Sequence, residues 1–163
     1  MSIRTSARVS SLLLVLACAA CAVDKESTVF AIQHLNPQGM HRNPAFSQAV
    51  AVRGAHQVLY VGGQNAVDGD GSIVGNGDIA AQAAQVASNV RTVLAAAGAS
   101  ADEIVKWNVY IVHGQPVGLA MQAFQSVLGR TTEPAAVSVL FVAGLAHPDF
   151  LLEVDAIAVS PAR

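Results

Sequence analysis

The chain has 163 residues, the length of about one domain, and its 53% hydrophobic and 12% charged residues exclude an intrinsically disordered protein. The formal charge is −2, and it becomes −4 when Arg4 and Arg8 are set aside. Because the sequence has no basic stripe and only 5% aromatic residues, nucleic acid is not an expected partner.

The N-terminus has the pattern of an export signal. Arg4 and Arg8 form a positive start, and Val9–Ala17 is an apolar run. A membrane-spanning helix needs about 20 apolar residues, so this run is too short to span a bilayer. It favours a removable signal peptide over residues 1–17, and we therefore expect the rest of the chain to be exported.

The end of the apolar run is similar to a bacterial lipobox, in which a cysteine is lipidated and becomes the mature N-terminus. Val15–Cys18 matches that pattern with Cys18 as the lipid attachment site; Cys21 is the alternative, and an ordinary cleaved signal is the third interpretation. Residues 18–27 then form a tether. Residues 28–163 form a domain that is periplasmic or held at the membrane by a lipid anchor only.

Strand patterns fill the first part of this domain. Alternating and apolar runs predict strands, and clusters of Gly, Asp and Asn predict the turns between them. The expected strands are 28–35, 47–53 and 58–63, the last two paired through a turn at Gly54–Gln57. Further turns are expected at Asp68–Ser72 and Gly75–Gly77.

A helix is predicted from Ile79 to Ala97. Asp78 is a suitable N-cap because its carboxylate can accept backbone N–H groups, and Gly98 is a suitable left-handed C-terminal cap. One face is apolar and consists of Ile79, Ala83, Val86, Val90, Val93 and Ala97. The polar residues that fall elsewhere around the helix are Gln82, Gln85, Asn89 and Arg91.

The second half of the domain alternates strands and helices. Ser100–Glu103 is a capping box that opens a single helical turn. After it we expect a strand over 105–112, a helix over 118–128 and strands over 137–142 and 151–159. The order β-β-β-α-β-α-β-β predicts one α+β domain.

No residue pattern indicates a metal or thiol site. Both cysteines lie before the domain, so it has no disulfide and no cysteine ligand. Asp68-x-Asp70-x-Ser72 is similar to the start of a calcium loop, but Ile73 and Ile79 replace the glycine and glutamate of such a loop, and a hairpin turn is favoured. The histidines share no ligand spacing and are expected at the surface; they are His34, His41, His56, His113 and His147.

Two carboxylates on the last predicted strand are the best candidates for chemistry. Glu153 and Asp155 are two residues apart, so their side chains point to the same face of an otherwise apolar strand. Such a pair needs hydrogen-bond partners, water or an interface, and a buried carboxyl group suits acid–base work. An exposed face is the alternative. Ser138 lacks a G-x-S-x-G pattern, and Gly62-Gly63 opens no phosphate loop.

Five stretches resemble the Rid family, also called YjgF-like, in order and spacing. They are Asn43–Ala49, Leu59–Gln64, Ala81–Gly98, Asp102–Lys106 and Glu133–Val159. The resemblance implies a chorismate-mutase-like α+β fold, with one mixed β-sheet carrying two helices on one face. It also implies a homotrimer with three ligand clefts between subunits, in which reactive enamines and imines are hydrolysed without metal or cofactor.

The resemblance implies roles for individual residues. Glu153 matches the glutamate that positions the attacking water. Cleft-lining positions are matched by Phe46, Gly62, Gly63, Ala136, Val137 and Ser138. Phe46 lacks the hydroxyl of the tyrosine that it replaces, and Ser138 stands where cysteine is common. Ala136 stands where the deaminating branch has an arginine for the substrate carboxylate, a contact worth about 1.5–3 kcal/mol.

Three functions are compatible with these features. The first is an exported, arginine-less Rid-like protein that binds or hydrolyses a small metabolite in intersubunit clefts. The second is a deaminase of 2-iminobutanoate or 2-iminopropanoate that recruits another cation, such as Arg130. The third is a non-catalytic module that binds a partner in the cell envelope.

Overall fold

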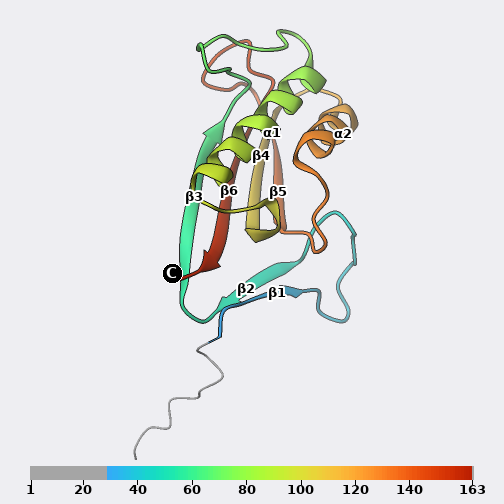
Figure 1. Ribbon diagram of the computed structural model, residues 1–163. Coiled ribbons are helices and arrows are strands. Elements are labelled where there is room, and N and C mark those ends of the chain that lie inside the picture. Colours follow the sequence, from blue (N-terminus) through green and yellow to red (C-terminus); the bar gives the residue numbers. More distant parts are fainter. Residues whose placement is uncertain (1–28, 163) are drawn as a thin grey trace, which may run out of the picture.

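The computed structural model describes residues 29–162. Strands β1 (Ala31–Leu35), β2 (Ala49–Arg53) and β3 (His56–Gln64) precede helix α1 (Ile79–Ala96). They are followed by a 3-10 turn (Ala101–Glu103), β4 (Ile104–Val112), α2 (Val117–Leu128), β5 (Ala136–Val142) and β6 (Leu152–Pro161). The predicted order of elements is confirmed, and the fold is the expected α+β type (Figure 1).

Some predictions concern residues outside this range. They are the signal peptide over 1–17, the tether over 18–27 and lipid attachment at Cys18 or Cys21, and they stay predictions. Within residues 29–162, no helix has the length and apolar character needed to cross a membrane.

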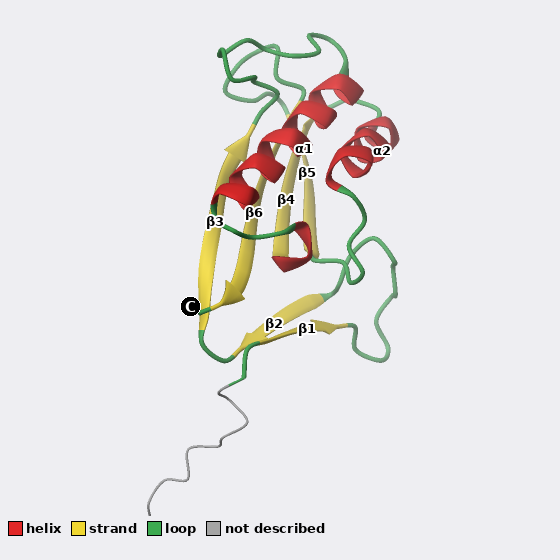
Figure 2. Cartoon of the chain, in the orientation of Figure 1, coloured by secondary structure: helices red, strands yellow, loops and turns green. Residues whose placement is uncertain are grey.

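Four strands form one mixed sheet in the order β3-β6-β4-β5. β4 and β5 are parallel, whereas β6 runs antiparallel to both β3 and β4. Figure 2 shows α1 and α2 on the same side of these strands. The core lies under the helices, because alternate residues of β6 are buried there: Leu152, Val154, Ala156 and Ala158 are each at most 2% exposed.

The first two strands form a separate hairpin, and here one prediction is wrong. β2 pairs with β1, whereas β3 pairs with β6, so β2 and β3 are not partners. The expected turn at Gly54–Gln57 shrinks to two residues, and Gly54 adopts φ 75° with its Cα packed against the Val29 backbone. A side chain would not fit there. The chain therefore changes from one sheet to the other at this glycine.

Helix α1 forms as predicted. The Asp78 carboxylate accepts the N–H groups of Ala80 at 2.9 Å and Ala81 at 3.2 Å, and Gly98 after the helix has φ 69°. The apolar residues buried on the helix are Ile79, Ala83, Val86, Ala87, Val90 and Leu94. The predicted apolar face is thus confirmed apart from its last member, Ala97, which is exposed.

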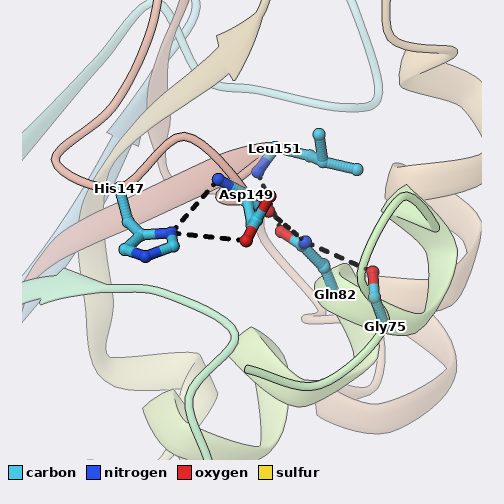
Figure 3. Close-up of polar contacts among 5 residues, drawn as sticks. All are labelled: Gly75, Gln82, His147, Asp149 and Leu151. Carbon is cyan, nitrogen blue, oxygen red and sulfur yellow. Dashed lines mark hydrogen bonds and ion pairs between the residues drawn. The ribbon is translucent and has the colours of Figure 1, made fainter. Parts of the chain in front are cut away.

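Gln82 departs from the prediction that it lies off the buried face, since it is 0% exposed. Its Nε2 donates to the carbonyl oxygens of Gly75 at 3.2 Å and Asp149 at 2.7 Å, and its Oε1 accepts the N–H of Leu151 at 2.8 Å. Figure 3 shows this amide between the loop before α1 and the loop before β6. Burial is tolerated because the amide satisfies three backbone groups.

Candidate functional site

The sheet face opposite the helices, called the open face from here on, carries the polar side chains. Lys106, Asn108 and Tyr110 alternate along β4, and Glu153 and Asp155 alternate along β6; all five are half-buried. Apolar residues on the same face are exposed: Tyr60 by 75%, Leu140 by 46% and Val58 by 43%. Half-buried charges beside exposed apolar side chains are expected where a ligand or another chain binds.

Glu153 lies at the end of the open face where β3 and β6 meet. Its Oε2 accepts a hydrogen bond from the Asn65 side chain at 3.0 Å. Its carboxylate covers the backbone of Gly63 so closely that a Cβ there would collide with it, whereas Gly62 borders open space. The other carboxylate oxygen, Oε1, has no hydrogen-bond partner within residues 29–162, and it can accept a proton from a ligand or water.

Helix α1 holds the loop that positions Glu153. Asn89 donates from Nδ2 to the carbonyl oxygens of Asn65 and Val67, both at 2.9 Å. Gln85 in turn donates to the Asn89 side chain at 2.8 Å. These helix residues, which the sequence places only off the apolar face, connect α1 to the candidate catalytic carboxylate.

Asp155 has both oxygens engaged. It accepts from Asn108 Nδ2 at 2.8 Å and from the Tyr110 hydroxyl at 3.1 Å. The hydrogen bond to Asp155 and the charge of that carboxylate, with smaller contributions from burial and from Glu153, raise the pKa of Tyr110 above its ordinary value. Asp155 therefore organises the open face, and Glu153 is the carboxylate left for chemistry.

The other predicted site residues lie at the far edge of the sheet, where β5 begins. Lys106 is the register partner of Ala136, and its Nζ donates to Ser138 Oγ at 2.6 Å. Ala136 and Ser138 therefore share the open face with Lys106. Val137 points to the helix-covered side, and Phe46 lies in the loop before β2.

The β1–β2 hairpin fixes this end of β5. The N–H of Ser47 donates to Ala135 O at 3.0 Å, and its Oγ donates to Pro134 O at 2.6 Å. His34 Nδ1 lies 2.9 Å from the same Pro134 oxygen. Because its hydroxyl is bonded to a carbonyl and it is only 2% exposed, Ser47 is an anchor and not a nucleophile.

The two groups of residues do not meet within one chain. β4 lies between β5 and β6; Ala136 pairs with Lys106, and Glu153 pairs with Tyr110, four residues further along β4. With strands about 4.8 Å apart and a rise of about 3.3 Å per residue, Glu153 and Ala136 are separated by roughly 16 Å. A small metabolite cannot touch both residues of the same chain.

A cavity of about 380 Å³ lies on the helix-covered side, between α2 and strands β4 and β5. Its walls are mostly apolar and include Trp107, Phe124 and Val137. Arg130 lines this cavity, so it lies on the other side of the sheet from Glu153. This placement argues against recruitment of Arg130 to a site on the open face.

Residues 29–162 contain no group of three or more His, Cys, Asp or Glu side chains placed to hold a metal ion. Asp68–Ser72 is a hairpin turn, as the sequence favours, and Val67 bridges Ile73 across it. Asp68 Oδ1 accepts the N–H groups of Asp70 at 3.0 Å and Ser72 at 2.9 Å. The Asp68 carboxylate is thus used by the turn itself.

Sequence analysis missed Lys106 and Asn65 as members of the site. The alternation of Lys106, Asn108 and Tyr110 with apolar residues is the signal that could have identified the polar face of β4. Asn65 carries no comparable signal, because its contact with Glu153 joins residues 88 positions apart.

Comparisons with known proteins agree with the fold. The family model described as Endoribonuclease L-PSP matches residues 39–160. A RutC family protein of Synechocystis is 32% identical over 117 residues, which are 71% of this chain and 86% of that protein. YyfB of Yersinia pestis, a solved protein of the Rid family, is 34% identical with a TM-score of 0.68, covering 78% of this chain and 97% of that one. TdcF of E. coli, solved with bound serine, is 29% identical with a TM-score of 0.56, covering 63% and 80%.

Proposed function

Because the chain belongs to the Endoribonuclease L-PSP family, called Rid above, we propose that it binds and hydrolyses a small imine or enamine in clefts completed by two copies. The arrangement of Glu153 carries this proposal. Its carboxylate is half-buried, Asn65 holds one oxygen, and within the described range the other oxygen has no hydrogen-bond partner. A carboxylate fixed in this way can accept a proton from an attacking water.

The reaction is addition of water to a C=N bond. Glu153 takes a proton from the water as the water oxygen bonds to carbon, and the π electrons move to nitrogen, which is protonated. Collapse of the tetrahedral adduct forms the C=O bond and breaks the C–N bond. Glu153 returns its proton to the departing nitrogen, so that one water is consumed and a carbonyl compound and ammonia are released.

A second copy supplies the other half of the cleft. Glu153 and Gly63 lie at one end of the open face, and Ala136 and Ser138 lie roughly 16 Å away. The homotrimer implied by the family resemblance would bring the β5 end of one copy to Glu153 of the next and cover exposed Tyr60. A sedimentation mass three times that of the chain is expected; a monomer would contradict this assembly.

The substrate cleft works without the arginine of the deaminating branch. Ala136 occupies that position and offers no charge-assisted hydrogen bond. TdcF was solved with serine bound, which supports a ligand that carries a carboxylate. An imine of an amino or oxo acid is therefore the substrate class to test first.

The test follows the loss of 2-iminobutanoate generated in the assay mixture. We expect the purified protein to accelerate hydrolysis above the buffer rate and Glu153→Gln to lower that acceleration by about 100-fold or more. Glu103→Gln, in the 3-10 turn, is the matched control. A rate no higher than buffer, or one that Glu153→Gln leaves unchanged, would contradict the proposal and favour the non-catalytic envelope module.

RNA is a necessary second substrate in this test, because the family's description names an endoribonuclease. We do not expect RNA cleavage, since acidic residues outnumber basic ones over residues 29–162. Cleavage that disappears in Glu153→Gln would assign the site to phosphodiester chemistry.

We also propose that the protein is exported and anchored through Cys18. Cell fractionation of Cys18→Ala and Cys21→Ala variants tests the anchor. Loss of membrane association in Cys18→Ala alone supports lipidation there. Membrane association that neither change affects would contradict a lipid anchor.

A further inference from the structure

Lys106 is a half-buried cation with little protein to satisfy it. It is the only lysine of the domain, since the one other lysine of the chain is Lys25. Its Nζ donates to Ser138 Oγ at 2.6 Å. An ammonium group has three donors, and in residues 29–162 no carboxylate lies within 4.0 Å of this one. A half-buried charge without a counter-ion favours an anion beside it.

The neighbouring polar groups do not supply that anion. Asp155 is the nearest carboxylate by register, and its two oxygens accept from Asn108 and Tyr110. The space beside Lys106 is left open instead, because its register partner is Ala136, a small and half-exposed residue. The ammonium can therefore be reached from the open face.

We propose that Lys106 and Ser138 form an anion subsite that takes the carboxylate of a small 2-oxo or 2-imino acid. The substrate class rests on the proposed function; the anion subsite rests on the Lys106–Ser138 geometry. Lys106 donates to the carboxylate with the hydrogens that Ser138 leaves free. Ser138 Oγ fixes the ammonium position, and its own hydrogen can donate to the same ligand.

Two other cations are alternatives that the geometry disfavours. Arg130 lines the cavity on the helix-covered side. Arg42 lines a separate recess that also includes His34 and Glu133, so a carboxylate is already part of that recess. Neither arginine belongs to the open face, where Ser138 lies.

The first measurement uses Lys106 as its own reporter. The protein carries Lys25→Arg and lysine labelled with ¹³C at Cε, so that one side-chain signal remains. We expect 2-oxobutanoate to shift this signal saturably, and the uncharged 2-oxobutanamide to leave it in place. A signal that does not respond to 2-oxobutanoate, or that responds equally to the amide, would overturn the subsite.

The second measurement compares affinities for 2-oxobutanoate by calorimetry. Lys106→Gln should weaken binding by about tenfold or more, because a charge-assisted hydrogen bond is lost, and Lys106→Arg should retain most of it. Arg130→Gln should leave the affinity unchanged. Equal affinity in Lys106→Gln and the unmodified protein, or a loss seen in Arg42→Gln or Arg130→Gln instead, would overturn the proposal.

The subsite and the proposed hydrolysis can fail separately. Binding at Lys106 without any imine hydrolysis would support the subsite and contradict the hydrolase. Hydrolysis that requires Glu153 while Lys106→Gln leaves KM unchanged would support the hydrolase and contradict the subsite.

Discussion

The carboxylate of Glu153 lies directly over the backbone of Gly63, where a Cβ would collide with it. β3 and β6 bring the two residues together, although they are distant in sequence. Asn65 completes the arrangement by donating to the same carboxylate at 3.0 Å. Glycine at position 63 is therefore a condition for the position of Glu153, and not only a feature of the strand end.

Gly63→Ala should displace Glu153 and lower imine hydrolysis about as far as Glu153→Gln does. The added methyl group occupies the space of the carboxylate, so the side chain must leave its bond with Asn65. The fold should persist, because Gly63 is exposed and the carboxylate is the flexible part of the contact. Steady-state rates and a thermal melt check both expectations.

Gly69→Ala is the matched control, since a Cβ at Gly69 meets no atom within 4 Å. Its rate should equal that of the unmodified protein. A Gly63→Ala variant as active as Gly69→Ala would show that the close approach of Gly63 and Glu153 does not matter for the chemistry.

Asp155→Asn should lower the pKa of Tyr110 toward the ordinary tyrosine value of about 10. In the unmodified protein, the hydrogen bond to Asp155 and its charge raise that pKa. The titration is followed by phenolate absorbance in a Tyr60→Phe background, because the chain has two tyrosines. An unchanged or higher pKa after the substitution would contradict the assigned cause.

The same contact gives a pH dependence of stability with a defined sign. A group whose pKa is raised by folding stabilises the folded state below its unfolded pKa, about 10 for tyrosine. That contribution is lost as pH rises through the folded pKa. Tyr110→Phe should therefore narrow the loss of stability on the alkaline side, which denaturant unfolding at a series of pH values measures.

Gln82→Leu should destabilise the fold by roughly 3 kcal/mol, because two carbonyl groups and one N–H lose their partner inside the protein. These groups belong to Gly75, Asp149 and Leu151, in two loops that Gln82 joins. Gln122→Leu, at an exposed position of α2, is the control and should change stability little. Equal effects of the two changes on urea unfolding would contradict the role of Gln82.

Local features of the fold could be predicted from the sequence because their signals are local. The apolar spacing along α1, its Asp78 cap and the alternation in β4 depend on neighbouring residues only. The choice of strand partner does not. β2 pairs with β1 because Gly54 packs on the Val29 backbone, a contact that spacing alone cannot indicate.

The candidate site was predictable in part for the same reason. Glu153 stands out as a carboxylate in an apolar strand. The burial of Gln82 depends on backbone groups of two distant loops, and the Lys106–Ser138 contact depends on the parallel register of β4 and β5. The separation of Glu153 from Ala136 also follows from sheet order, which no residue pattern displays.

Mixing two inactive variants tests most directly whether the site is shared between copies. Glu153→Gln removes one half of each cleft, and Ala136→Trp fills the other half. Each should be inactive alone while assembling as the unmodified protein does. Chains reassembled together in equal amounts should recover about a quarter of the unmodified activity, since a random cleft takes both intact halves at that frequency. No recovery, or full activity of Ala136→Trp alone, would contradict a cleft built from Glu153 of one copy and β5 of the next.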